Sequence, residues 1–304
     1  MQVKILVLDT INPYLNISRE YNYYSNLKDD EIIFLLWQNE PCVVIGRNQN
    51  IYREIDLEFI AQNNIVPLRR FTGGGSVYHD LGNLNFTFIS SQKNKNVDCW
   101  INIILNALRK EGIKAQLRGR NDLLFKGKKI SGMAWLEDEK KFLIHGTLMV
   151  DLDLTKLSKC LTPDRSKFKG KGIKSVKSRV LNLKELNPCI SVESLKHHLI
   201  KAFKEIYSDA RMIRPKEYPD EEKISKMLKS EHWIFGKREK AQIQRVLKIE
   251  GRPLNLDIYI DDDTISNVNI YSDSLDLKNI EKIKSILIGK KYKDLHIPDV
   301  IKSI

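Results

Sequence analysis

Residues 69–80 read RRFTGGGSVYHD, in which three consecutive glycines follow two arginines, a phenylalanine and a threonine. Each glycine inside a strand or helix weakens that element by about 0.5–1 kcal/mol, so three in a row predict a loop with an unusual backbone. Two interpretations are open. The stretch is either a tight hairpin between two strands, or a loop whose exposed N–H groups lie against an anion beside fixed positive charge.

The segments on either side of this loop predict a sheet with helices packed against it. Apolar runs typical of strands occupy residues 4–9, 31–38, 41–46, 65–68, 82–90, 113–117, 122–136 and 141–152, and helical periodicity occupies residues 14–27, 56–64, 97–112 and 191–208. Asp98 is the expected N-cap of helix 97–112, and Ser191 is that of helix 191–208. Because most connections between strands are short, we predict an α+β fold with mixed, mainly antiparallel sheets flanked by helices, and we expect these helices on one face of the sheet.

The C-terminal part of the chain predicts a separate small unit. Residues 214–240 form a charged, proline-bearing stretch that interrupts the pattern of strands and helices. After it, residues 243–273 predict three strands and residues 275–289 predict a helix, which together make a compact α+β unit. We therefore predict a large domain at 1–243 and a small accessory domain at 244–304.

Composition bears on the compartment and the partners. The formal net charge is +12 and the pI is about 9.3, which favours phosphate-rich or acidic partners without choosing between them. Free thiols in a reducing cytoplasm are the simplest interpretation of the four cysteines, which form no CxxC pair: Cys42, Cys99, Cys160 and Cys189. No apolar run approaches the roughly 18 residues of a membrane span, and residues 1–10 predict a strand rather than a signal peptide. We therefore expect a cytoplasmic protein with no membrane partner.

Motifs exclude several common chemistries. The glycine stretch has no Lys-Ser or Lys-Thr where a P-loop requires it, and Tyr78 stands where a dinucleotide fingerprint needs its third glycine. The chain has no HExxH, and its six histidines have no metal-ligand spacing. No nucleophile-elbow pattern exists, although the sequence alone leaves a Ser-His-Asp arrangement open.

Two clusters of cations remain as candidate anion sites. Arg69 and Arg70 end the strand before the glycines, and a guanidinium fork suits phosphate and carboxylate oxygens. Further on, residues 117–135 read LRGRNDLLFKGKKISGMAW. Lys128 and Lys129 alternate in direction along a strand, so one of them turns inward and needs an anionic partner. For each cluster taken alone, a solvated turn is the plainer interpretation.

Six segments together resemble lipoate–protein ligases of the two-domain kind. They occur in the family's order and spacing between residues 37 and 240, and they read RRFTGGGSVYHDLGNLNFTFI, GRNDL, KKISGMAW, HGTLMVDLDLTKLSKCLTP, KGIKSVKSRVLNL and EHWIFGK. The small C-terminal unit is similar to the family's accessory domain, which is expected to be short here because the chain ends soon after YKDLHI. Met133 departs from the family pattern, in which a small residue follows Ser-Gly, and this predicts a reshaped acyl pocket.

The resemblance implies an ATP-dependent, adenylate-forming enzyme with the biotin and lipoate ligase fold. Such a ligase uses ATP and Mg²⁺ to convert lipoate into lipoyl-AMP and pyrophosphate. It then passes the lipoyl group to the ε-amine of a specific lysine on an acceptor domain. The implied acceptors are acidic lipoyl domains, either of 2-oxoacid dehydrogenase subunits or of an H-type protein of glycine cleavage.

The resemblance also implies roles for individual residues. Lys129 matches the motif lysine and is the implied catalytic residue, bridging the lipoate carboxyl oxygen and the α-phosphate. The implied ATP-binding residues are Arg70, which contacts a phosphate, Gly75, Ser76, Val77, Tyr78, Asn121, Asp122 and Lys129. Asp122 is also the implied Mg²⁺ ligand. The implied lipoate-binding residues are Gly73, Gly74, Lys129 and His145. Backbone donors and a cation suit an adenylate because they neutralise its charge without attacking it.

Three alternatives remain. A lipoyl or octanoyl transferase uses a cysteine nucleophile just before the lysine motif, whereas residues 113–125 contain no cysteine. A biotin–protein ligase has a nucleotide loop that residues 69–80 do not match. A basic nucleic-acid-binding protein interleaves aromatic residues with its cations, but residues 167–179 offer only Phe168, so nucleic acid is not an expected partner. The sequence leaves open the preferred acyl donor, the oligomeric state and whether the activation step is retained.

Overall fold

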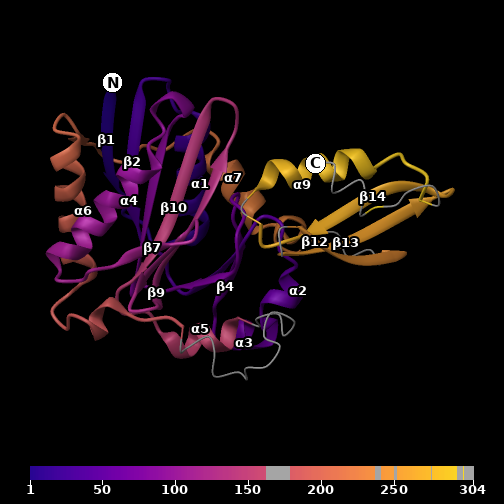
Figure 1. Ribbon diagram of the computed structural model, residues 1–304, viewed down its shortest axis with the longest axis horizontal. Helices are drawn as coiled ribbons and strands as arrows, with labels where there is room; N and C mark the ends of the chain where they lie inside the picture. Colours follow the sequence, from indigo (N-terminus) through magenta and orange to yellow (C-terminus); the bar gives the residue numbers. More distant parts are fainter. Residues whose placement is uncertain (162–178, 237–240, 250–251, 275, 293–296, 298–304) are drawn as a thin grey trace.

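The structure is a computed structural model that describes residues 1–161, 179–236, 241–249, 252–274, 276–292 and 297 of the chain. A large body of sheet and helices lies beside a small lobe, which the C-terminal strands and the last labelled helix form (Figure 1). The large body holds an eight-stranded and a three-stranded sheet, and the small lobe holds a second three-stranded sheet. This arrangement confirms the predicted α+β class.

The main sheet has the strand order β11-β1-β2-β6-β10-β9-β8-β7. Its strands are β1 (Gln2–Val7), β2 (Glu31–Trp37), β6 (Asn83–Ser91), β7 (Gln116–Arg118), β8 (Asp122–Phe125), β9 (Lys128–Glu137), β10 (Lys141–Met149) and β11 (Arg211–Met212). β1 runs parallel to both of its neighbours, and the other neighbouring strands are antiparallel. The sheet is therefore mixed and mainly antiparallel, as predicted.

Helices cover both faces of the main sheet, so the expectation of helices on one face is wrong. Every residue of β2 is buried, and alternate residues of that strand enter two different apolar clusters. Phe34 belongs to the cluster that α4 (Val97–Lys110) and α6 (Val192–Ile206) complete on one face. Trp37 belongs to the cluster that α1 (Pro13–Ser25) completes on the other face. A continuous apolar run is what a strand buried on both faces requires.

The glycine stretch connects two strands of the second sheet. That sheet has the order β4-β3-β5, formed by β3 (Cys42–Ile45), β4 (Val66–Arg69) and β5 (Val77–His79). Because β4 and β5 lie on opposite sides of β3, the loop between them crosses the end of β3. The hairpin interpretation is therefore excluded. Three short helices pack against this sheet: α2 (Ile51–Glu54), α3 (Leu57–Gln62) and α5 (Leu154–Cys160).

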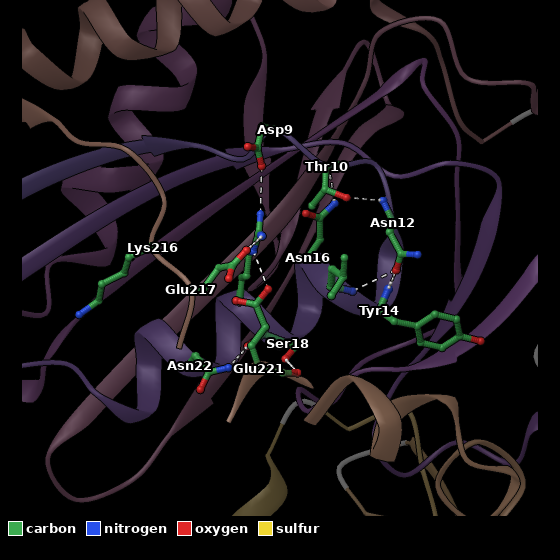
Figure 2. Close-up of polar contacts among 12 residues, drawn as sticks. Asp9, Thr10, Asn12, Tyr14, Asn16, Ser18, Asn22, Lys216, Glu217 and Glu221 are labelled. Carbon is green, nitrogen blue, oxygen red and sulfur yellow. Dashed lines mark hydrogen bonds and ion pairs between the residues drawn. The ribbon is translucent and has the colours of Figure 1, made fainter. Parts of the chain in front are cut away.

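The charged stretch 214–240, which was predicted to interrupt the pattern of strands and helices, forms two helices in its described part. It contains α7 (Glu221–Lys229) and α8 (Glu231–Phe235), while residues 237–240 lie outside the described residues. Acidic residues begin α7 and lysines end it, which complements the helix dipole. The hydroxyl of Ser18 donates to the Glu221 carbonyl and thereby joins α1 to α7 (Figure 2). Two further single turns, Gln92–Asn94 and Leu183–Glu185, are 3-10 helices.

One of the two predicted helix caps is correct. Ser191 caps α6, because its hydroxyl accepts the N–H of Ser194 at 3.0 Å. The cap of α4 is Asn96 rather than Asp98, since the Asn96 side chain accepts the N–H of Cys99 at 3.1 Å. Asp98 already lies in the first helical turn.

The small lobe is a three-stranded antiparallel meander with one helix on it. Its elements are β12 (Ile243–Ile249), β13 (Arg252–Asp261), β14 (Thr264–Tyr271) and α9 (Leu277–Leu287). Within the described residues, its apolar cluster shares no member with the three clusters of the large body. The lobe touches the large body through backbone: Ser272 N–H donates to the Asn48 carbonyl at 2.9 Å, and Gly74 N–H donates to the Ser274 carbonyl at 3.1 Å. The boundary at 243 stays a prediction.

Candidate functional site

A cavity lies where the glycine loop faces the main sheet. At its outer end Gly75 is exposed and Lys129 is half-buried, whereas at its inner end Trp37 and His79 are buried. The residues that line it are Ile17, Trp37, Val44, Arg70, Gly74, Gly75, Ser76, Val77, His79, Asn85, Asn121, Lys129, Gly132, Met133, Ala134, His145, Gly146 and Thr147. The cavity thus joins the three-stranded sheet, α1 and the middle of the main sheet.

The glycine loop has a backbone that other residues would not permit. Gly74 has a φ of +88°, in the left-handed region that favours glycine. A Cβ on Gly46, in the turn after β3, would lie 2.1 Å from the Gly74 carbonyl oxygen, so the two segments are in close contact. Ser76 Oγ donates to Gln49 Oε1 of the same turn at 2.9 Å. Among the described residues none accepts the N–H of Gly75 or of Ser76, which leaves two adjacent donors at the cavity rim.

Arg70 supports the glycine loop from within. Its Nε donates to Thr72 Oγ1 at 2.8 Å, and its Nη atoms donate to the carbonyls of Val44, Gly73 and Gly75. These bonds use four of the five donors that a guanidinium has. Burial lowers the pKa of Arg70 to about 10, so it is still charged at neutral pH. The implied contact of Arg70 with a phosphate stays a prediction.

Arg69 leaves β4 on the opposite side and braces the site from outside. Its guanidinium donates to five carbonyls, those of Gly46, Arg47, Gln49, Trp233 and Ile234. It therefore fixes α8 and the turn after β3 against each other. Burial lowers its pKa to about 10. Both arginines of the motif thus hold backbone in place.

Lys129 is the lysine that faces the cavity. It is half-buried on β9, whereas Lys128 beside it is exposed, so the expected inward-turning lysine is Lys129. Its Nζ lies 2.8 Å from Asp122 Oδ1, an oxygen that is itself inaccessible to solvent. A Cβ on Gly132 would lie 2.7 Å from that Nζ, so any side chain at residue 132 would displace the amine. Asp122, through its ion pair, and Gly132, through its lack of a side chain, together fix the position of the Lys129 amine.

Asn121 and Met133 form the edge of the cavity next to Lys129. The Asn121 amide donates to the Met133 carbonyl at 3.1 Å, and Met133 N–H donates back to the Asn121 carbonyl at 2.7 Å. These two bonds fix the entry of β8 against β9. Met133 lines the cavity, and a reshaped acyl pocket at this residue stays a prediction.

A buried carboxylate, Glu20 of α1, organises the inner wall. His145 Nδ1 lies 2.9 Å from Glu20 Oε1, and His145 Nε2 lies 2.9 Å from Thr72 Oγ1. Since a carboxylate only accepts, His145 donates from Nδ1 and accepts at Nε2 from the Thr72 hydroxyl. Thr72 in turn accepts from Arg70 Nε. These hydrogen bonds therefore form a chain in which each residue donates to the next, from Arg70 to Thr72, from Thr72 to His145 and from His145 to Glu20.

A second chain of hydrogen bonds ends at the same carboxylate. Trp37 Nε1 donates to Thr87 Oγ1 at 3.0 Å, and Thr87 Oγ1 donates to Glu20 Oε1 at 2.6 Å. Trp37, Arg70 and His145 all line the cavity. Glu20 therefore orients three residues of the cavity wall although it does not line the cavity itself.

Strand alternation decides which residues of β5 reach the cavity. Val77 and His79 line it, whereas Tyr78 between them turns into the apolar cluster that contains Val43 and Ile45. Tyr78 is 2% exposed. Tyr78 does not line the cavity, and its implied role in ATP binding stays a prediction.

The structure brings most of the predicted site residues together. Eight line the cavity: Arg70, Gly74, Gly75, Ser76, Val77, Asn121, Lys129 and His145. Three do not: Gly73, whose carbonyl is held by Arg70, Tyr78, and Asp122, which is paired with Lys129. The sequence analysis missed the inner wall, which comprises Ile17, Trp37, Val44, His79 and Asn85. For His79 a signal existed, because it stands two residues from Val77 on a strand.

The described residues offer little support for a metal site, a cysteine nucleophile or a membrane-spanning helix. No group of three or more His, Cys, Asp or Glu side chains that could hold a metal ion occurs in the described part of the chain. The four cysteines are free, and none lines the cavity. Burial raises the pKa of the Cys42 thiol and raises that of Cys160 to about 11, which disfavours a thiolate nucleophile at either residue. Within the described residues, no helix has the length and apolar character needed to span a bilayer.

Comparison with known proteins identifies relatives of both parts of the chain. Residues 12–204 match the family described as the Lipoyl protein ligase A/B catalytic domain, and residues 238–304 match the Bacterial lipoate protein ligase C-terminus. Lipoate-protein ligase A of Psychrobacter cryohalolentis is 36% identical over 303 residues, which cover 96% of this chain and 89% of that protein. Lipoate-protein ligase LplJ of Bacillus subtilis is 30% identical over 315 residues, which cover 99% and 94%.

Solved structures resemble the chain in fold as well as in sequence. LipL1 of P. falciparum, solved in complex with lipoate, superposes with a TM-score of 0.87 at 34% identity and covers 99% of this chain and 94% of its own. A lipoate-protein ligase A bound with ATP has a TM-score of 0.67 at 27% identity and covers 78% and 99%. A bipartite ligase of Thermoplasma acidophilum, described with its E2 lipoyl domain, has a TM-score of 0.69 at 28% identity and covers 80% and 100%.

Proposed function

Because the chain belongs to the lipoate–protein ligase family, we propose that the cavity beside the glycine loop is where it activates lipoate as an acyl-adenylate. The activity is ATP-dependent ligation of lipoate, with transfer of the lipoyl group to acceptor domains. The proposal assigns the residues of this chain to the steps of that reaction.

In the first step, an oxygen of the lipoate carboxylate attacks the α-phosphorus of ATP. The bond between that phosphorus and the oxygen that bridges it to the β-phosphate breaks, and pyrophosphate leaves. The free N–H groups of Gly75 and Ser76 are available to donate to phosphate oxygens at the rim. The ammonium of Lys129 neutralises charge on the attacking carboxylate and on the α-phosphate.

In the second step, the neutral ε-amine of an acceptor lysine attacks the acyl carbon of the adenylate. The bond from that carbon to the phosphate oxygen breaks, AMP leaves, and the new amide loses a proton. Lys129 again acts on the phosphate of the leaving AMP, because this phosphate is the α-phosphate whose charge it neutralised in the first step. The ion pair with Asp122 holds the Lys129 amine in the same place during both steps.

The acyl chain of lipoate would extend from Lys129 toward the inner end of the cavity. Ile17, Trp37 and Val44 supply apolar surface there, and each is at most 2% exposed. The hydrogen bonds that end at Glu20 hold this wall in one arrangement. An apolar pocket with few fixed polar groups is the usual form of a small-molecule site.

Mg²⁺ fits this site as an ion that arrives with the nucleotide. Asp122 is the residue that would hold it, because Mg²⁺ in nucleotide sites commonly uses one or two carboxylates together with phosphate oxygens and water. The described residues offer no cluster that would bind the ion without ATP. When bound, the ion would reduce the negative charge on the phosphates.

We also propose the wider setting of the enzyme. Its acceptors are acidic lipoyl domains, either of 2-oxoacid dehydrogenase subunits or of an H-type protein of glycine cleavage, and the net charge of +12 supports that complementarity. The ligase domain spans residues 1–243 and the accessory domain spans residues 244–304. The free state of all four cysteines supports a cytoplasmic location.

The observation that carries the assignment is the Lys129 ammonium, held by Asp122 over Gly132 on the wall of the cavity whose rim carries two free N–H groups. Exchange of labelled pyrophosphate into ATP tests it directly. We expect exchange that depends on added lipoate, because adenylate formation is reversible. If exchange is absent while supplied lipoyl-AMP still modifies an acceptor domain, the cavity performs transfer alone.

A further inference from the structure

One polar group at the inner end of the cavity has no role in the chemistry described above. His79 lines the cavity and is 4% exposed. Its Nε2 atom is inaccessible to solvent and has no hydrogen-bond partner among the described residues. Buried polar atoms are almost always paired, so an unpaired one on the wall of a ligand cavity indicates that the ligand supplies the partner.

The hydrogen bonds behind His79 determine whether Nε2 donates or accepts. Asn16 Nδ2 lies beside the carbonyls of Thr10 and Gln38, which identifies it as the NH₂ group, and its two hydrogens are shared among these carbonyls and Asn39 Oδ1, which lies 3.0 Å away. Asn39 therefore presents its own NH₂ group to His79 Nδ1, which lies 3.2 Å away. His79 Nδ1 accepts this bond and carries no proton.

His79 is then a neutral imidazole with its single proton on Nε2. Burial lowers the pKa of His79 to about 3, and the nearby charge of Arg70 contributes to that lowering. His79 thus lines the cavity and carries an N–H donor at Nε2 that has no acceptor among the described residues. Asn85, which also lines the inner end, has an amide nitrogen without a partner among the described residues.

The acyl chain has to supply that acceptor if it fills the inner end. A saturated chain such as octanoate ends in a methyl group and offers none. Lipoate ends in a dithiolane ring, and a divalent sulfur is a weak acceptor. Trp37 lies on the same wall, and sulfur also makes favourable contacts with aromatic rings.

We propose that the Nε2–H of His79 donates to a sulfur of the dithiolane ring, and that this bond makes the site select lipoate over octanoate. The inference rests on the proposed function, since it assumes that the acyl chain enters with its carboxylate at Lys129. A site built to hydrogen-bond its substrate rejects an analogue that lacks the partner, because the buried donor is then left unpaired.

The size of the selection follows from the weakness of the acceptor. A sulfur bond discriminates less than an oxygen bond, so we expect kcat/KM for lipoate to exceed that for octanoate by about tenfold through this contact, equivalent to about 1.4 kcal/mol. Replacing both ring sulfurs by CH₂ gives 5-cyclopentylpentanoate, which has the ring and the chain length but no acceptor. The wild-type enzyme should therefore treat this analogue as poorly as octanoate.

Two variants separate the hydrogen bond from the shape of the wall. His79→Phe keeps a planar ring and removes the donor, so we expect the lipoate to octanoate ratio of kcat/KM in pyrophosphate exchange to fall about tenfold. His79→Gln places an amide NH₂ near the position of Nε2, so we expect it to retain most of the preference. Thermal melting of both variants checks that they are folded.

The outcomes are distinguishable from failure of the proposed function. If no acid supports exchange, the activation step itself is absent. If lipoate and octanoate both support exchange and the ratio is the same in the wild type and His79→Phe, the inference about His79 is overturned and the activation step stands. If the variant does not fold, the wild-type comparison of lipoate with 5-cyclopentylpentanoate decides alone, and equal rates overturn the inference.

Discussion

At the scale of single residues, the site depends on pairs of adjacent residues whose side chains point in opposite directions. Arg69 and Arg70 are adjacent, yet the first holds α8 and the second holds the glycine loop. Lys129 faces the cavity while Lys128 faces solvent. Both arginines mainly hold the backbone in place, whereas Lys129 faces the cavity and can meet a substrate there.

Lys129→Ala should reduce adenylate formation by about 10²–10³-fold, because it removes one well-placed donor from the charged transition state. Lys129→Arg should restore little activity, since a planar fork cannot replace a compact charge in the space over Gly132. Lipoylation of an acceptor domain and lipoate-dependent pyrophosphate exchange measure both variants.

The matched control is Lys128→Ala, which removes the same charge from the exposed side of the same strand. It should keep most of the activity. Circular dichroism confirms that each variant is folded. Equal activities in the two alanine variants would contradict the assignment of Lys129.

At the scale of elements, the ends of helices are the features that are hardest to predict from the sequence, and α4 is an example. Asn96 begins α4 because its backbone is not helical, with φ −144° and ψ 75°, while its side chain accepts the N–H of Cys99. Asp98 is the more acidic candidate, but it lies inside the first turn, where it interacts only with the helix dipole. Asn96 and Asp98 therefore stabilise α4 by different mechanisms and by different free energies.

Asn96→Ala should lower the free energy of unfolding by about 1 kcal/mol, because the cap hydrogen bond is lost. Asp98→Ala should cost less, about 0.3–0.5 kcal/mol, since only the dipole interaction is removed. Urea denaturation followed by far-UV circular dichroism measures both. A larger loss for Asp98→Ala would show that the cap lies two residues further along the chain.

Much of the fold could be predicted because its main strands are apolar and its long helices are amphipathic. The helix α7 could not, since it follows two prolines and has few apolar residues, and α8 could not, since five residues are too short to show a helical period. The outer end of the site could be predicted because glycines and cations mark it. The inner end could not, because Trp37 and Val44 look like ordinary core residues until topology places their strands beside the cavity.

At the scale of the whole molecule, the small lobe touches the site without sharing its core. Ser274 accepts the N–H of Gly74 in the glycine loop, and Arg53 of α2 donates to Asn255 of β13 at 3.1 Å. The apolar clusters of the two parts share no residue in the portion of the chain that the structure describes. Hydrogen bonds at the surface therefore hold the lobe against the site.

Removing residues 244–304 should leave the large domain folded, because no apolar cluster of that domain loses a described member. We expect the truncated protein to melt cooperatively and to keep its helical circular dichroism signal. Static light scattering shows whether it stays dispersed. Precipitation or a loss of helical signal would show that the two parts depend on a shared core, and would move the boundary away from residue 243.

The crossing of the glycine loop over β3 has a consequence for the order in which the protein is made. The cavity wall joins Ile17 of α1 to Thr147 of β10, so its residues are contributed by widely separated parts of the chain. Contacts of such sequence separation close long loops, which is entropically costly and slow. A chain emerging from the ribosome can form α1 early, but it has no cavity wall until residue 147 has been released and the two sheets have met. The cavity wall is therefore complete only after more than half of the large domain has been released, and a shorter nascent fragment cannot consume ATP on an unfinished site.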